Sequence, residues 1–104
     1  MQNVTKKELV IDVSNQTGIE QEKVSLVLEA VMSTITSELA QGNSVVMRNF
    51  GTFQVQEVKQ KIGRNPKDPA KDVIIPARAV AKFKPGKEMK NKVAPVLPVL
   101  KENA

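Results

Sequence analysis

The residues in this chain that are best suited to chemistry are cations, and they crowd into residues 59–84. The basic side chains there are Lys59, Lys61, Arg64, Lys67, Lys71, Arg78, Lys82 and Lys84. Only Asp68 and Asp72 oppose them within that segment. Lysine and arginine at this density attract a polyanion, because their summed potential concentrates negatively charged partners at the surface. The segment therefore predicts binding to a negatively charged partner.

The sequence lacks the residue types most often used in catalysis and metal binding. The chain contains no histidine and no cysteine, which removes the usual general base, the commonest metal ligand and the usual nucleophile pairs. The lack of cysteine also rules out a disulfide framework and fits a reducing compartment. We therefore expect a protein that is not an enzyme and has no metal site, no cofactor and no small-molecule substrate.

Charge is spread unevenly along the 104 residues, whose net charge is +5. Residues 59–92 contain eleven Lys/Arg and three Asp/Glu, a local balance of +8, and the remainder contains five and eight, a balance of −3. This pattern favours nucleic acid as the partner, with an anionic membrane surface as the second choice. No stretch approaches the ~18 apolar residues of a membrane span, and residues 1–10 have no apolar signal core. We expect a cytoplasmic, nucleoid-associated protein with no membrane partner.

The basic segment has the pattern of a long β-hairpin arm, at about residues 59–80. Gly63, Arg64, Asn65 and Pro66 form a turn-prone cluster near its middle. An extended chain rises about 3.3 Å per residue, so one side of the hairpin spans roughly 25 Å, on the order of the width of a duplex. A hairpin with so few apolar residues to bury is not there for stability alone.

Two helices are predicted ahead of this arm. Thr5 and Glu8 form a capping box that starts a helix at about Lys6, and a longer helix is expected at about residues 20–41, with Gly42 as its left-handed stop. The apolar residues of the longer helix recur at helical spacing, and they are Val24, Val27, Leu28, Val31, Met32, Ile35 and Leu39. The two helices are expected to form a hairpin through one shared apolar face.

A three-stranded antiparallel sheet is predicted next, because the apolar period changes to two. Its strands are expected at about residues 44–48, 53–58 and 72–84, with Pro76 at an edge or a bend because proline donates no ladder hydrogen bond. The only aromatic residues in the chain are Phe50, Phe53 and Phe83. A packed cluster is the favoured interpretation for them, and stacking on bases is the alternative.

One short helix and a tail are expected after the sheet. Pro85 and Gly86 open a helix at residues 87–93, whose basic face and free N-terminal amides suit a phosphate. The prolines of the tail, residues 94–104, are too close together for a helix, so this segment is predicted to be flexible.

The resulting α+β domain, at residues 1–93, is too thin to close its own core. Two helices and three strands leave one sheet face and part of the helix stripe without a partner. Short chains often complete such a core by association, and a two-fold homodimer is the default. Dimerisation would place two basic arms on one side of the assembly, able to clasp a duplex between them.

Three motifs resemble those of the bacterial HU / integration host factor family of histone-like DNA-bending proteins. They are Asn49-Phe50-Gly51-Thr52-Phe53, Gly63-Arg64-Asn65-Pro66 and Phe83-Lys84-Pro85-Gly86-Lys87. Any one motif alone would be weak, but their order and spacing are specific, and the resemblance, closest to HU, runs from about Val4 to Val93. It implies an intertwined dimer with a helical base and two β-arms that wrap the minor groove of double-stranded DNA.

The resemblance also implies roles for individual residues. Pro66 would wedge between base pairs and kink the duplex, with Arg64 and Asn65 entering the minor groove beside it. Minor-groove architectural proteins, HU and integration host factor among them, insert apolar wedges in this way. Phosphates on the flanks would be held by Arg48, the backbone near Gly51, Lys84 and Lys87. The dimer core would contain Phe50, Phe53 and Phe83.

The remaining cations divide by their place in the chain. Phosphate contact is favoured for Lys59, Lys61, Lys71, Arg78, Lys82 and Lys84, and Lys67 belongs to the same basic arm. A solvated surface is favoured for Lys6, Lys7 and Lys23. Asn49 departs from the family, which usually has glycine there, and the arm tip reads Lys67-Asp68-Pro69-Ala70 in place of a Thr-Gly turn.

The leading functional prediction is a homodimeric protein that binds double-stranded DNA largely without sequence specificity, bending and compacting it. A site-specific bender resembling integration host factor is the alternative within the family. An RNA or mixed nucleic-acid binder is a second class, and a module for an acidic protein or anionic lipid is a third, disfavoured because the cations lie on a hairpin. Association with a paralogue as a heterodimer remains open.

Overall fold

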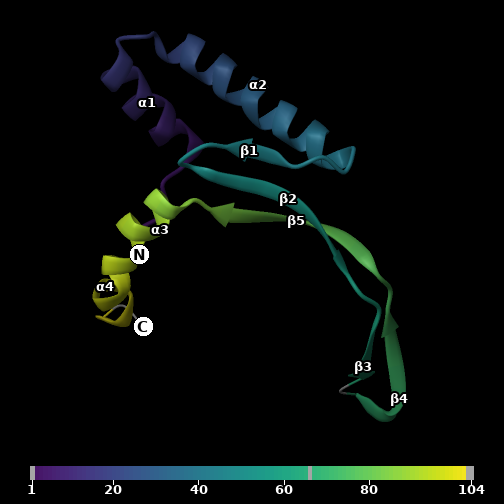
Figure 1. The fold of residues 1–104 in the computed structure, drawn as a ribbon. Coiled ribbons are helices and arrows are strands. Elements are labelled where there is room, and N and C mark those ends of the chain that lie inside the picture. The colour runs from purple at the N-terminus through teal and green to yellow at the C-terminus, as the bar shows by residue number, and fades with distance from the viewer. Residues whose placement is uncertain (1, 66, 103–104) are drawn as a thin grey trace.

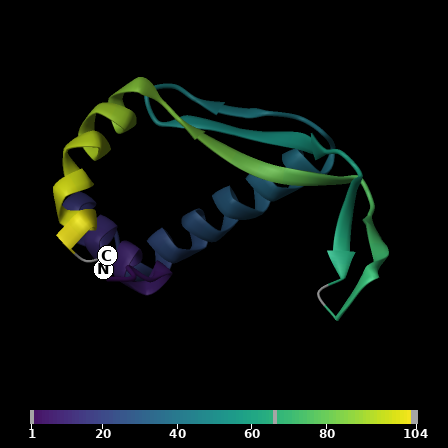
Figure 2. The same ribbon diagram turned by 90° about the horizontal axis from the view of Figure 1, so that it is seen from below.

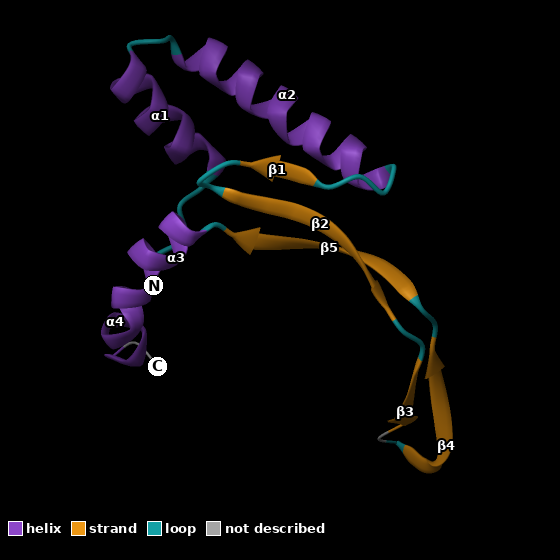
Figure 3. Ribbon diagram, in the orientation of Figure 1, coloured by secondary structure: helices purple, strands orange, loops and turns teal. Residues whose placement is uncertain are grey.

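A helical hairpin lies above a three-stranded sheet, and a two-stranded arm bends away from one end of that sheet (Figure 1). The computed structural model describes residues 2–65 and 67–102. The elements in order are α1 (Lys6–Thr17), α2 (Gln21–Ala40), β1 (Val45–Met47), β2 (Gly51–Val58), β3 (Lys61–Asn65), β4 (Asp68–Ile75), β5 (Arg78–Pro85), α3 (Lys87–Val93), the 3-10 turn η1 (Ala94–Val96) and α4 (Leu97–Glu102). Figure 3 separates the helices from the strands. The predicted α+β class and element order are confirmed up to α3.

Local signals set the ends of the two long helices. The Thr5 hydroxyl oxygen accepts a hydrogen bond from the Glu8 backbone N–H at 3.3 Å, which confirms the predicted N-terminal cap of α1. Gly18 ends α1 and Gly42 follows the end of α2, both with positive φ (75° and 85°). Glycine adopts this left-handed conformation without steric cost.

The long helix α2 lies across one face of the sheet, and α1 packs beside it (Figures 1 and 2). Among the residues whose burial the structure describes, Val10 of α1 and Val24 of α2 are the only buried apolar side chains. Other members of the predicted α2 stripe, Val27, Val31 and Met32, are exposed. The stripe is therefore only partly covered by the chain's own sheet and α1.

The strand order β1-β2-β5 is antiparallel throughout, and β3 and β4 pair as a separate two-stranded ladder. The prediction of one returning strand over residues 72–84 was wrong, because the chain breaks between β4 and β5 at Pro76 and Ala77. The break falls at the predicted bend, where a residue without a backbone N–H ends the pairing. The predicted arm spanned residues 59–80, whereas Arg78 already pairs with Val58 in the main sheet.

The prediction that the tail forms no helix was also wrong. The turn η1 and helix α4 continue from α3, with both prolines in first-turn positions: Pro95 is the second residue of η1, and Pro98 is the second residue of α4. Proline is tolerated there because the backbone N–H groups of the first turn have no intrahelical acceptor. The flexibility of the tail stays a prediction.

The chain is far more open than a self-contained domain of its size. Its accessible surface is 9044 Å², against about 5,800 Å² for a monomeric protein of this mass. Its radius of gyration is 19.3 Å, against about 13 Å for a compact chain of this length. The predicted thin body is confirmed. Within the described residues, no helix combines the length and apolar character needed to cross a membrane.

Candidate nucleic-acid interface

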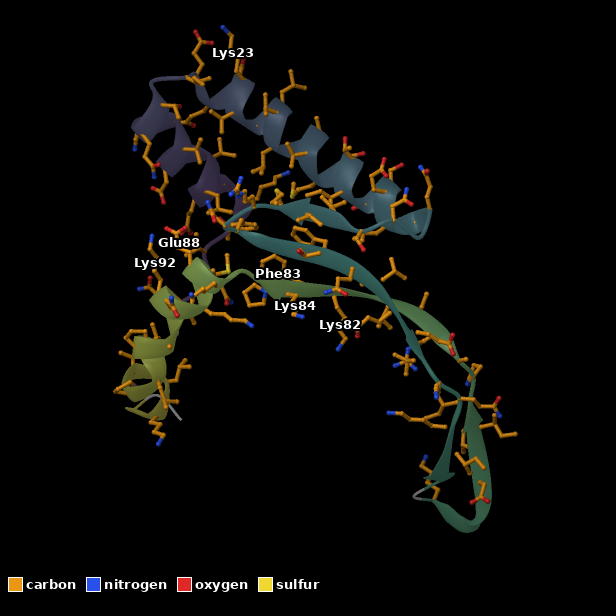
Figure 4. The ribbon with its side chains drawn as sticks, viewed as in Figure 1. Lys23, Lys82, Phe83, Lys84, Glu88 and Lys92 are labelled. Atoms are coloured by element: carbon orange, nitrogen blue, oxygen red, sulfur yellow. The ribbon has the colours of Figure 1, made fainter. Side chains whose placement is uncertain are left out.

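The strand β5 sorts its side chains onto two faces of the sheet. Lys82 and Lys84 point from β5 toward the concave side of the molecule, the side toward which the arm bends, and Phe83 points to the other face (Figure 4). This arrangement follows from the two-residue period of a strand, which places neighbouring side chains on opposite faces. One face of β5 is therefore cationic and the other apolar.

The cationic face continues across the sheet into β2. The register pairs Gln54 with Lys82 and Thr52 with Lys84, and directly paired residues share a face. By the same alternation Arg78, paired with Val58, lies on this face. Sequence analysis missed Thr52 and Gln54 as polar neighbours of the lysines. The alternation of polar and apolar residues in TFQVQ, residues 52–56, contained that signal.

The opposite face carries the phenylalanine cluster. The ring of Phe83 lies 4.8 Å from that of Phe53 and 5.5 Å from that of Phe50, centroid to centroid, both tilted. These separations are typical of favourable aromatic pairs. The packed cluster predicted from sequence is confirmed. Phe50 and Phe83 nevertheless remain 47% and 40% exposed in the single chain.

Gly51 allows this cluster to pack against the sheet. A Cβ atom at Gly51 would lie 2.5 Å from Cζ of Phe83 and 2.7 Å from the backbone oxygen of Lys84. Both separations are far below van der Waals contact, so any side chain at position 51 displaces the ring or the strand. The glycine of the FGTF motif is thus required by the third phenylalanine.

The first and third motifs meet beside the cationic face. The Gly86 N–H donates to the Phe50 carbonyl oxygen at 2.9 Å. A shallow hollow of about 390 Å³ has Arg48, Gly51 and Lys84 in its lining, which brings together three of the four residues predicted to hold flanking phosphates. The fourth, Lys87, does not line it and instead begins α3 as an exposed residue.

Asn49 lines the same hollow with φ 69°. Asparagine is several-fold enriched among non-glycine residues with positive φ. Asparagine therefore suits the turn that follows Arg48.

The arm extends away from the helical hairpin (Figure 1), and its described lysine and apolar side chains are exposed. Lys59 precedes β3 and Lys61 begins it, and both are exposed; Lys67 lies in the turn, also exposed. Four apolar side chains of the arm are exposed as well, and they are Ile62, Val73, Ile74 and Ile75. The described part of the arm thus contains no buried apolar residue.

The predicted arm-tip residues are placed only in part. Arg64 and Asn65 lie on β3 and Lys71 lies on β4, and the structure describes their backbone but not their side chains. Pro66, the predicted wedge, lies outside the described residues.

The helical body has its own cations, which lie outside this surface. The Lys6 ammonium donates to a carboxylate oxygen of Glu29. The hydrogen bond and the positive charge of Lys6 both lower the pKa of Glu29. Lys7 and Lys23, predicted to be solvated, are exposed.

Comparison with known proteins gives the family of this fold. Residues 4–94 match the family model described as "Bacterial DNA-binding protein". The chain belongs to this family. HU from Thermotoga maritima is 42% identical over 90 residues, covering 86% of this chain and 99% of that protein. The integration host factor subunit beta of Xanthomonas campestris pv. campestris is 33% identical over 97 residues, covering 92% and 93%.

A solved member of the family has the same fold. The Anabaena HU–DNA cocrystal structure superposes with a TM-score of 0.81 at 36% identity, covering 88% of this chain and 98% of that one. That HU was crystallised together with DNA. The resemblance drawn from the three motifs is confirmed at the level of the family and the fold.

Proposed function

We propose that two copies of this protein together bind double-stranded DNA, largely without sequence specificity, and bend and compact it at the nucleoid. DNA binding follows from membership of the bacterial DNA-binding family, whose relatives include HU proteins. The proposal adds the number of subunits, the location of the contact and the deformation of the duplex. Domain boundaries at residues 1–93, with a tail at 94–104, are part of it.

One observation carries the location of the contact. The cationic face of β5 and the bend of the arm lie on the same concave side of the chain (Figures 1 and 4). A duplex held on that side would meet Lys82 and Lys84 on the sheet and Lys59 and Lys61 on the arm. Cations contributed by both surfaces neutralise phosphates and release counterions, which makes the affinity strongly dependent on salt.

The exposed apolar surface supports a homodimer. The phenylalanine cluster remains partly exposed, as do Val27, Val31 and Met32 of α2. Exposed apolar patches of this kind mark association surfaces, and a second copy of the same chain is the simplest partner because it supplies a self-complementary face. In such a dimer Phe50, Phe53 and Phe83 lie in the core between subunits.

Bending is assigned to the arm. Pro66 is proposed as the wedge between base pairs, with Arg64 and Asn65 in the minor groove beside it. Proline is apolar and rigid, so it loses little side-chain entropy when it is inserted. Wedging costs unstacking energy, which the wrapped contact surface offsets, as in the minor-groove architectural proteins that include HU and integration host factor. The further phosphate contacts are proposed for Arg48, Gly51, Lys67, Lys71, Arg78, Lys84 and Lys87.

The test compares bending with affinity. A duplex of about 30 base pairs with a donor and an acceptor dye at its ends reports bending by energy transfer, and titration of the same sample reports affinity. We expect Pro66→Ala to reduce strongly the energy transfer between the ends of the bound duplex, while the affinity for DNA changes less. Pro69→Ala is the matched control, because it makes the same change three residues away, and it should bend DNA as the original does. Unchanged transfer in Pro66→Ala would refute the wedge.

The same duplexes separate the competing functions. Competition at equal salt between random-sequence and A-tract-containing DNA measures specificity, and competition with duplex RNA measures the choice of nucleic acid. We expect less than about tenfold preference among DNA sequences and weaker binding to RNA, whose deep, narrow major groove and A-form shape give the arm no comparable entry. A large preference for one defined site would favour the integration-host-factor type of function.

A further inference from the structure

The last three helical elements form one rod. Helix α3, turn η1 and helix α4 follow one another without an intervening residue, from Lys87 to Glu102, and Figure 3 shows them leaving the sheet as a continuous column. Five apolar residues of the rod share one side at helical spacing i, i+4, i+7, i+8 and i+11. This set, called here the rod stripe, is Met89, Val93, Val96, Leu97 and Leu100.

The chain itself leaves most of the rod stripe uncovered. Val93, Leu97 and Leu100 are 56%, 54% and 50% exposed. In Figures 1 and 3 α4 extends beyond α3, away from the sheet and the helical hairpin. The rod's lysines lie in α3 and at Lys101, and residues 94–100 contain no charged side chain. An exposed apolar surface of this length is a surface that lacks its partner.

The stripe is continuous with the phenylalanine cluster. Met89, its first member, lines one hollow together with Phe50 and a second hollow together with Phe83 and Val93. The second hollow, about 350 Å³ in volume, connects the cluster to the rod stripe. The surface that the proposed dimer buries therefore does not end at the sheet but runs along the rod.

We propose that the rod stripe is an extension of the subunit interface and that a second copy of this chain covers it. The proposal rests on the homodimer proposed above. It assigns a role to residues 95–102, which lie beyond the residues that match the family model. A second copy fits better than DNA because the stripe is uncharged, and because the phenylalanine cluster at its base belongs to the proposed dimer core.

The first experiment measures the dimer dissociation constant by sedimentation over a range of concentrations. Leu97→Ser combined with Leu100→Ser should raise that constant at least about tenfold. Burying a leucine side chain contributes about 1.5–3 kcal/mol, and about 1.4 kcal/mol corresponds to a tenfold change in the constant. Leu26→Ser is the matched control, because Leu26 is 71% exposed on α2 and lies on the side of that helix opposite Val24. It should change the constant less than about twofold. Circular dichroism checks that both variants keep their helices.

The second experiment does not depend on weakening the dimer. The chain has no cysteine, so Leu100→Cys introduces a single thiol whose rate of alkylation reports its accessibility. We expect that rate to fall at least about fivefold as the protein concentration rises through the dissociation constant. A thiol at the control position, in Leu26→Cys, should react at the same rate throughout.

The outcomes separate this proposal from the proposed function. A full-length chain that sediments as a monomer at every concentration overturns both the dimer and the extension. The extension alone is overturned if the chain is a dimer, the double serine variant leaves its dissociation constant unchanged, and the Leu100→Cys thiol reacts at the same rate at every concentration. That result leaves the proposed DNA bending untouched. The extension is also overturned if the Leu100→Cys thiol is protected only when vesicles of anionic phospholipid are added. It is overturned as well if the chain is a tetramer that the double serine variant converts to a dimer.

Discussion

The main sheet and the arm are both antiparallel β-structure, yet they are held in place differently. The sheet β1-β2-β5 has α2 over one face and a phenylalanine cluster packed against that same side. The arm β3-β4 pairs as a separate two-stranded ladder, and its described apolar side chains are exposed. An isolated two-stranded hairpin is marginally stable in water. Packing therefore explains the sheet but not the arm, for which we propose contact with DNA as the reason.

One glycine in each region, Gly51 in the sheet and Gly63 in the arm, shows the same contrast. Gly51 of the sheet has no room for a Cβ atom, whereas a Cβ at Gly63 of the arm would meet Ile75 Cδ1 at an ordinary 3.6 Å. Tight packing makes the sheet intolerant of change, and open surroundings make the arm tolerant of it. Stability should therefore respond more to mutations in the sheet than to mutations in the arm.

Removal of the arm should have the largest effect. Val58 and Arg78 are cross-strand partners, so residues 59–77 can be replaced by Asn-Gly, which forms a two-residue hairpin turn. We expect DNA affinity at physiological salt to fall at least ~100-fold because the proposed contacts of the arm lysines with phosphates and of the arm tip with the minor groove are lost. The melting temperature should hardly change. An arm-deleted protein that binds DNA normally would contradict the division of roles.

Substitution of the two glycines sharpens the contrast in stability. Gly51→Ala should destabilise the protein by about 1–3 kcal/mol, the usual cost of overpacking. Gly63→Ala, the matched control in the arm, should stay within about 0.5 kcal/mol, as substitutions away from packed sites usually do. Urea denaturation followed by circular dichroism measures both. Equal losses in the two variants would mean that the arm is packed as tightly as the sheet.

Paired lysine substitutions test whether sheet and arm share the duplex. Lys82→Ala with Lys84→Ala on the sheet, and Lys59→Ala with Lys61→Ala on the arm, should each lower the slope of log affinity against log salt by about one to two. Lys7→Ala with Lys23→Ala, in the helical hairpin, is the control and should leave the slope unchanged. A slope that responds to only one of the first two pairs would confine the contact to that region.

The smallest effect is expected in the helical hairpin. Lys6 lowers the pKa of Glu29, so their ion pair stabilises the fold above the unfolded-state pKa of that carboxyl, about 4.5. The contribution is lost as the pH falls through the lowered folded-state pKa. Because both side chains are exposed, the stability lost in Lys6→Ala should be slight at pH 7 and smaller near pH 3 or in high salt. Urea midpoints at the two pH values check this, with Lys7→Ala as the control.

Sequence predicted the features that depend on local chemistry. The cap at Thr5, the left-handed Gly42 and the change of apolar period are properties of a few neighbouring residues. The phenylalanine cluster followed from three aromatic residues beside apolar strands.

Features that depend on where an element begins were harder to predict. Pro95 and Pro98 exclude a helix only when they lie past its first turn, and sequence did not place the starts of η1 and α4. The role of Gly51 was likewise hidden, because its close neighbour Phe83 is remote in the chain. Side chains at the arm tip stay predictions.

Hydrogen exchange of the free and DNA-bound protein tests the central claim most directly. In the free protein, amides of β3 and β4 should exchange much faster than those of β2 and β5, because no packing holds the arm closed. With saturating duplex DNA, the arm amides should become protected by at least about tenfold while those of the sheet change little. An arm that is already protected without DNA, or one that DNA leaves exchanging freely, would contradict the account.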